Sequence, residues 1–361
     1  MRSFLAVLLL SLSLASIEAR AAEVDQFSNR SQPIEDSTQL LENKVNEWFS
    51  LALARANQRL LQSGPRRTGR FYKPAQCREE RLYESLAWYF ARPVIGQLET
   101  YAEESADIPR RRIKFEDSVY QDFLWPESPS LVLSRRMAAV IKVQGVEFGS
   151  DKLGHFFTEG LSYFEATEGL EKDIQFGLHF GRWTESLYFG AQTTGVFSYA
   201  DLVANFNGLR FWNRVLAEKS DPLTGQIAPY VECRGTEWVL VNEFNWQPYV
   251  DNGWNEAVNC STFRSSVLLD KVLSHQPVCA SDKLPVDKYA GHDLSLLNHE
   301  GLSIMEDSME PEMLVWEKAR LDKADTSASL ISRLREARLK WEEWRHQLAL
   351  DTQDNTKQSV Q

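Results

Sequence analysis

Apolar residues recur at helical spacing along most of the chain. Residues 34–61 contain neither Gly nor Pro, and Asp36 or Ser37 can cap a helix there. Its apolar face comprises Leu41, Val45, Trp48, Phe49 and Ala52. The same pattern predicts a helix over 78–105, broken before Pro93 because proline lacks the backbone N–H. Further helices are predicted at 130–143, 151–165, 171–188, 199–219 and 262–274.

The pattern changes after Pro222. Residues 222–263 are rich in turn formers, Trp and β-branched residues, and "TEWVLV" (236–241) predicts a strand, with a small hairpin around it. A loop-like stretch then leads to a strongly helical block at 311–350. Its apolar seam at 330–348 can lie on the body of the protein or on a partner helix. The seam comprises Leu330, Leu334, Ala337, Trp341, Trp344 and Leu348.

These elements predict a mainly α fold. We expect a multi-helix globular bundle with a small irregular β or loop insert at about 222–263 and a long C-terminal helix. An α/β parallel sheet would need several apolar strand runs between the helices, and the sequence does not contain them. The polar tail at 351–361 extends beyond the last helix.

The N-terminus has the pattern of a secretory signal peptide. Arg2 precedes an apolar run from Phe4 to Ile17, and Ala19 and Ala21 supply the small residues before cleavage. We therefore expect a signal peptide at 1–21 and an exported chain, periplasmic or secreted. It should have a loose leader at 22–34 and a main domain at 35–310 that includes a disulfide-tied insert at 222–285. No later apolar run is long enough to span a membrane, and no Cys follows the cleavage site to carry a lipid.

Four cysteines remain after cleavage, an even number that fits two disulfides in an oxidising compartment. Three pairings are open. We predict Cys233 with Cys260, closing one irregular loop, and Cys77 with Cys279, tying the two halves of the chain together. The wide spacing excludes a thiolate zinc cluster of the CxxC type.

The chain carries 40 basic and 51 acidic residues, a net charge of −11, which argues against general nucleic-acid binding. Two basic segments, 66–81 and 110–114, stand out against this balance. They could dock on anionic lipid or an envelope polymer, or pair with the acidic C-terminal helices of the same chain. The arginines concerned are Arg66, Arg67, Arg70, Arg110, Arg111 and Arg112.

The stretch "GSDKLGHFFTEGLSYF" (149–164) places Asp151, His155 and Glu159 on one face of a helix. Imidazole and carboxylate at this spacing are ligands for a divalent metal such as zinc, which could activate water for hydrolysis. The alternative is a solvated helix face with Asp151 as a cap. Gly154 and Gly160 would allow close approach of another backbone or a ligand.

A second polar pair lies in "SYADLVANFNG" (198–208). Asp201 and Asn205 are one turn apart on an otherwise apolar helix, where polar groups need partners. Capping by Ser198 and Asp201 explains the aspartate but not Asn205. In the metal-site interpretation, Asp201 or Asn205 from this helix would combine with Asp151, His155 and Glu159.

No HExxH or GxSxG motif is present. The run "DKLGHF" (151–156) resembles the DKxxHF helix openings of VanZ-like proteins and of predicted periplasmic lipoproteins of unknown function. This resemblance implies that Asp151, Lys152 and His155 form a functional cluster, but it implies no reaction. Two hypotheses follow: an envelope protein with a binding or structural role, which the lack of a catalytic motif favours, and a metal-dependent hydrolase acting on an envelope component.

Overall fold

A computed structural model describes residues 23–62, 77–91, 96–186, 190–275, 279, 282–289, 294–298 and 302–304. These residues belong to the first of two units, 1–305. The signal peptide (1–21), the basic segment around Arg66, Arg67 and Arg70, and the C-terminal helix (311–350) with its tail are predictions that lie outside the described residues. None of the described helices is long and apolar enough to cross a membrane.

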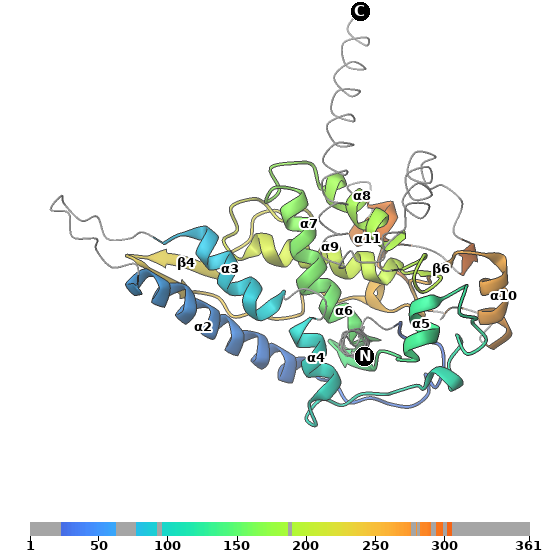
Figure 1. Cartoon of the computed structure of the whole chain (residues 1–361). Helices are drawn as coiled ribbons and strands as arrows, with labels where there is room; N and C mark the ends of the chain where they lie inside the picture. Colours follow the sequence, from blue (N-terminus) through green and yellow to red (C-terminus); the bar gives the residue numbers. More distant parts are fainter. Residues whose placement is uncertain are drawn as a thin grey trace, which may run out of the picture. The chain divides into compact units, whose positions relative to one another are not determined.

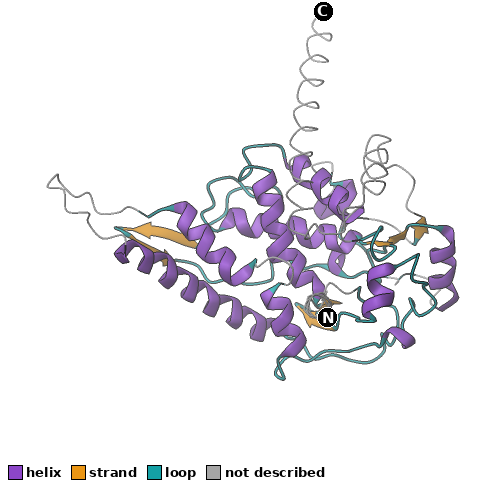
Figure 2. Ribbon diagram, in the orientation of Figure 1, coloured by secondary structure: helices purple, strands orange, loops and turns teal. Residues whose placement is uncertain are grey.

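The described part of the chain is mainly α, as predicted (Figures 1 and 2). The longer helices are α2 (Thr38–Gln62), α3 (Glu79–Phe90), α4 (Gln97–Glu104), α8 (Ile174–Thr184), α9 (Tyr199–Arg214) and α10 (Ser266–His275). A continuous helical run is formed by α6 (Asp151–Gly154), the π-helical segment η2 (His155–Glu159) and α7 (Gly160–Ala166). Short helices complete the set: α5 (Pro129–Ser134), α11 (Val286–Tyr289), η1 (Phe115–Asp117), η4 (Asn252–Trp254) and η6 (Ser295–Leu297).

The strands form small sheets. β1 (Val140–Val143) and β2 (Val146–Gly149) make one antiparallel hairpin, and β4 (Val231–Arg234) and β5 (Glu237–Leu240) make another. In a third sheet, β6 (Thr262–Phe263) lies between β3 (Val196–Phe197), antiparallel to it, and β7 (Ser303–Ile304), parallel to it. The predicted strand within the insert is therefore confirmed as β5.

The predicted helix at 130–143 is wrong. It ends as α5 at Ser134, because Arg135 adopts a left-handed φ of 51°. Val140–Val143 forms β1 instead, and the turn to β2 has positive φ at Gln144 (54°) and Gly145 (77°). Positive φ at both turn positions is the geometry that joins two twisted antiparallel strands, so the hairpin turn overrides the helical spacing of these residues.

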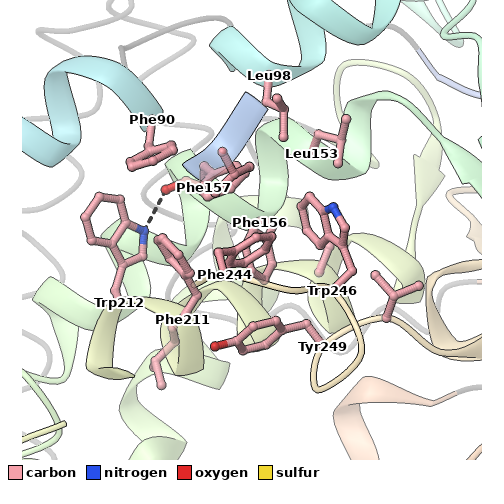
Figure 3. Close-up of a cluster of buried hydrophobic side chains, with 14 of the residues drawn as sticks. Phe90, Leu98, Leu153, Phe156, Phe157, Phe211, Trp212, Phe244, Trp246 and Tyr249 are labelled. Carbon is pink, nitrogen blue, oxygen red and sulfur yellow. Dashed lines mark hydrogen bonds between the residues drawn. The ribbon is translucent and has the colours of Figure 1, made fainter. Parts of the chain in front are cut away.

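Aromatic side chains from distant segments form the main core (Figure 3). Phe156 and Phe157 of η2 are fully buried against Phe211 of α9, with ring centroids 5.4 Å and 5.1 Å away. The indole nitrogen of Trp212 donates a hydrogen bond to the backbone carbonyl of Phe157 (2.8 Å). The core thus fixes η2 against α9. Because His155 is the first residue of η2, its position relative to α9 is fixed as well.

Glycines bring the helical run α6–η2–α7 against α9. A Cβ on Gly160 would lie 2.5 Å from the Cα of Gly208, and a Cβ on Gly208 would meet the carbonyl oxygen of Phe156. Gly154 packs in the same way against the carboxyl of Glu99. The close approach expected of Gly154 and Gly160 is therefore confirmed, and no larger residue fits at the crossing with α9.

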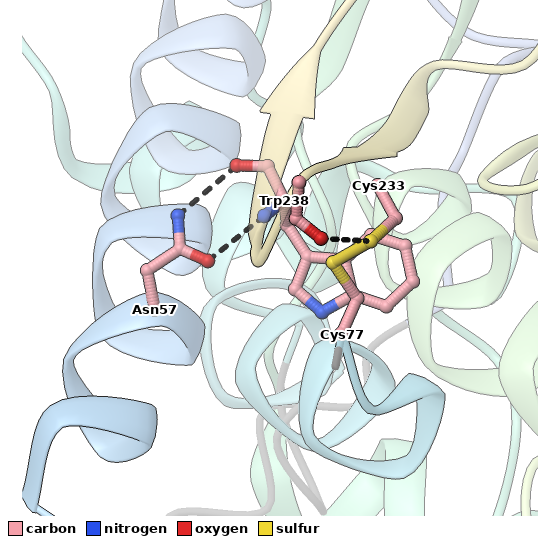
Figure 4. The surroundings of a disulfide bond; sticks show 5 residues. Asn57, Cys77, Cys233 and Trp238 are labelled. Atoms are coloured by element: carbon pink, nitrogen blue, oxygen red, sulfur yellow. Dashed lines mark hydrogen bonds between the residues drawn. A yellow bond between two sulfur atoms is a disulfide. The ribbon is translucent and has the colours of Figure 1, made fainter. Parts of the chain in front are cut away.

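The predicted disulfide pairing is wrong, although all four cysteines are paired. The disulfides are Cys77–Cys233 and Cys260–Cys279. Cys233 lies on β4, which pairs with β5. Two hydrogen bonds between Asn57 of α2 and the backbone of Trp238 hold β5 beside α2, and Cys77 lies just before α3 (Figure 4). Cys260 is buried in a separate apolar cluster with Phe263 and Leu268, so it pairs within that cluster.

Gly160→Ala should lower the free energy of unfolding by about 1–3 kcal/mol, because the added methyl group forces the backbone of Gly208 to move. Urea denaturation of the disulfide-intact protein measures this change. Ser162→Ala on the same helix is the control and should stay within about 0.5 kcal/mol. Equal stability of the two variants would contradict the close packing of α7 on α9.

Candidate functional site

A buried ammonium group lies at the centre of the polar residues. Lys152 is 0% exposed, and its Nζ lies 2.5 Å from Asp151 Oδ2, 2.5 Å from Asp201 Oδ1 and 2.6 Å from Glu256 Oε1. Burial lowers the pKa of Lys152, but the three carboxylates outweigh it and raise the pKa well above its usual value. Lys152 therefore stays charged inside the protein.

The three carboxylates come from separate segments. Asp151 begins α6, Asp201 lies in the first turn of α9, and Glu256 follows η4. Ser198 caps α9 by accepting from the backbone N–H of Asp201 (3.2 Å), and its hydroxyl lies 3.0 Å from Asp201 Oδ1 and 2.9 Å from Glu256 Oε1. The predicted cap at Ser198 is confirmed, and the same serine also belongs to the site.

His155 lies beside this group on the π-helical segment. Its Nε2 is 3.1 Å from Asp201 Oδ2, and its side chain is 16% exposed. Burial opposes a charged ring, yet the Asp201 carboxylate outweighs burial and raises the pKa of His155 to about 10. Burial likewise opposes the charge of Asp201, but His155 and Lys152 hold its pKa below the usual range. The imidazolium–carboxylate pair is thus the stable form in the metal-free protein.

Asn205 contacts the other ring nitrogen. Its side-chain amide lies 3.0 Å from His155 Nδ1 and 3.2 Å from the Tyr163 hydroxyl. With the amide oxygen toward the ring, Asn205 accepts from Nδ1–H. In the reverse orientation its nitrogen donates to Nδ1 and to the backbone carbonyls of His155 and Asp201. In both orientations Asn205 fixes the ring so that Nε2 faces Asp201.

Carboxyl groups outnumber cations here. Around Lys152 and His155 the structure gathers Glu23, Glu99, Asp151, Glu159, Glu185, Asp201 and Glu256. Burial, with repulsion from Asp201, raises the pKa of Glu185 to about 8. Burial also raises the pKa of Glu256 to about 7, against the attraction of Lys152. The surplus negative charge is therefore relieved by protons in the metal-free protein.

Two carboxylate oxygens of this group have no hydrogen-bond partner within the described chain. They are Asp151 Oδ1 and Glu256 Oε2, on residues that are 8% and 0% exposed. A buried polar atom without a partner costs about 1–3 kcal/mol, and more when it is charged. Such atoms call for a proton or a cation.

Asp151, His155 and Asp201 form the one set in the described residues whose ligand atoms suit a metal ion. One ligand atom from each lies within 4.8 Å of the others. Asp201 thus takes the place in this group that we expected for Glu159. Glu159 lies on the same helical run, partly buried, and burial raises the pKa of its carboxyl. The expected convergence of Asp201 and Asn205 on His155 is present.

Sequence reasoning from residue spacing missed several members of the site. Lys152 entered only through the resemblance of "DKLGHF". Glu256 lies in an irregular loop, and Glu23 follows the predicted signal peptide, so neither has a periodic signal. Glu185 lies at the end of α8, where it accepts from the backbone N–H of Ser198 (3.2 Å). Its helical position gave no hint that it is buried.

The second basic segment is engaged within the chain. Arg111 is 6% exposed and lies 3.0 Å from Glu147, and Arg112 lies 2.5 Å from Glu103. Arg110 donates to the backbone carbonyls of Ala102 and Ser105. Contacts within the chain therefore engage all three arginines. Arg111 and Arg112 have acidic partners on β2 and α4, and Arg110 has backbone carbonyls.

Comparison of the chain with protein-family models, with curated proteins and with solved structures found no match.

Lys152→Met should lower the free energy of unfolding by about 3–5 kcal/mol, because it leaves buried carboxylates without their counter-charge. Urea denaturation at pH 7 measures the loss. The control, Lys172→Met, removes an i,i+4 pair with the exposed Glu168 and should cost about 0.5 kcal/mol or less. A similar small loss in both variants would mean that Lys152 does not neutralise the centre.

Stability should depend on pH through Glu185. Its folded-state pKa of about 8 lies above the value of about 4.3 for an unfolded glutamate, so the folded state keeps a proton that the unfolded state releases. The free energy of unfolding should therefore fall as pH rises from about 4.3 through 8. Glu185→Gln, which cannot titrate, should make this fall shallower in metal-free protein.

Urea denaturation between pH 5 and pH 9 measures how the free energy of unfolding depends on pH. Glu171→Gln is the control, since Glu171 is exposed and pairs at the surface with Lys219. An unchanged slope in Glu185→Gln would show that Glu185 is ionised in the folded protein at neutral pH.

Proposed function

We propose that this protein is an exported envelope protein whose Asp151, His155 and Asp201 side chains bind a divalent cation such as zinc. Its two disulfides fit an oxidising compartment outside the cytoplasm. The observation that carries the proposal is the convergence of three ligand atoms within 4.8 Å, inside a buried region with surplus carboxyl groups. A divalent cation would neutralise charge that protons otherwise neutralise.

The donor set suits zinc chemically. Zinc in proteins is held by imidazole nitrogen and carboxylate oxygen, and a ligating histidine usually donates its second N–H to a nearby acceptor. With its amide oxygen toward the ring, Asn205 supplies that acceptor, 3.0 Å from His155 Nδ1. Binding through Nε2 requires a neutral ring, so the cation must displace a proton from His155, and affinity should rise with pH.

A second candidate function is metal-dependent hydrolysis of an envelope component. His155 and Glu159 are partly exposed, whereas Lys152 and Glu256 are fully buried. Three protein ligands leave a coordination position open for water on zinc. Burial raises the pKa of the Glu159 carboxyl, which favours a role as an acid toward a leaving group.

His155→Ala should abolish zinc binding, because it removes the only nitrogen ligand of the set. Zinc content of the purified protein by mass spectrometry, and titration calorimetry of the metal-free protein, measure this. The matched control is His179→Ala on α8, which removes an exposed histidine and should leave the zinc content unchanged.

Equal zinc in the wild type and in His155→Ala would remove His155 as a ligand, and a wild type that binds no divalent cation would refute the proposal. The same variants decide the second candidate. Zinc-dependent hydrolysis of ester, amide or glycoside bonds in envelope polymers should be absent from His155→Ala and present in His179→Ala.

A further inference from the structure

The first described residues, Glu23–Phe27, run through the interior of the protein. Val24, Asp25, Gln26 and Phe27 are each 3% exposed or less, although they lie outside every helix and named strand. We call this segment the N-terminal strap. It differs from the loose leader expected at 22–34, because the start of that range is buried.

Backbone and side-chain hydrogen bonds hold the strap. The Ala138 N–H donates to the carbonyl of Glu23 (3.0 Å), and Val24 forms a parallel bridge with Ala138. Asp25 Oδ2 accepts from the backbone N–H of Val119 (2.9 Å). The anchors lie on segments far away in sequence, so the strap is an inserted element rather than part of a local turn.

Gln26 connects the strap to the carboxylates around Lys152. Its Oε1 accepts from the backbone N–H of Glu256 (2.8 Å), and its Nε2 donates to Asn255 Oδ1 (3.1 Å) and to the carbonyl of Glu147 (2.8 Å). Gln26 therefore fixes the loop position from which Glu256 reaches Lys152.

Val24 supports the other side of the site. A Cβ on Gly149 would lie 2.7 Å from the Cβ of Val24 and closer still to Asp151 Oδ1. Gly149 is thus enclosed between the Val24 side chain and the Asp151 carboxylate. Glu23 brings a further carboxyl toward Glu256 and Asp201. The strap therefore lies against the site at two places: at Glu256, through Gln26, and beside Asp151, through Val24.

We propose that the strap and the cation site are energetically coupled. The seated strap positions Asp151, a cation ligand, and Glu256, which holds Lys152 beside the ligands, and the cation in turn holds the strap in place. This inference rests on the proposed function. Such coupling is reciprocal, since any factor by which the seated strap raises cation affinity must equal the factor by which the cation stabilises the seated strap. The strap lies outside every helix and named strand, so it can open without unfolding them, and such coupling can therefore control it.

Gln26→Ala in the full-length mature chain should weaken zinc binding by roughly tenfold, within the usual range of coupling between two sites. The matched control is Gln32→Ala, which truncates an exposed glutamine in the same N-terminal region. Titration calorimetry gives both affinities, and circular dichroism checks that each variant is folded.

Hydrogen exchange of the wild type is the second measurement, and it does not depend on any variant folding. Zinc should slow exchange of the strap amides by roughly tenfold, more than it slows exchange in β4 and β5, and this effect should shrink in Gln26→Ala. A purely structural strap would be slowed by zinc no more than β4 and β5, which report the general stabilisation by the bound cation.

The coupling is overturned if zinc slows strap exchange no more than exchange in β4 and β5, or if Gln26→Ala binds zinc with wild-type affinity. Either result, in a wild type that binds zinc through His155, would leave the proposed function standing. A wild type that binds no divalent cation would overturn both proposals.

Discussion

Moving an ammonium group out of water costs several kcal/mol unless carboxylates compensate for it. In this protein that compensation at Lys152 needs Asp151 from its own helix, Asp201 from α9 and Glu256 from a loop a hundred residues away. The interaction therefore ties together segments that local structure alone would leave independent. The position of His155, one turn after Asp151, and the cap at Ser198 both depend on this arrangement.

The helix crossing makes that compensation possible. Gly160 and Gly208 bring α7 and α9 into backbone contact, and Phe156 and Phe157 anchor the π-helical segment in the aromatic core. π-Helical turns occur frequently at functional sites. Here the segment keeps two consecutive phenylalanines in the core while His155 meets Asp201. Packing and polar chemistry thus specify the same contact between the two helices.

The surplus of carboxyl groups gives the site its chemical character. It raises the pKa values of Glu185 and Glu256, and a divalent cation at Asp151, His155 and Asp201 would balance it more directly. The N-terminal strap contributes to this surplus of carboxyl groups, because it brings Glu23 to the group and holds Glu256 through Gln26. The binding role, the hydrolytic alternative and the coupling all follow from this one region.

The sequence by itself determined the mainly α fold, most helix positions, the break near Pro93, the β5 strand and the shared face of Asp151 and His155, because these follow from local periodicity and turn chemistry. It also indicated Asp201 and Asn205, since polar residues on an apolar helix need partners. Only the tertiary structure decided which cysteines pair, that Val140–Val143 is a strand, and that Glu256, Glu185 and Glu23 join the site. Those outcomes depend on long-range contacts between irregular segments, and residue spacing along one chain carries no record of such contacts.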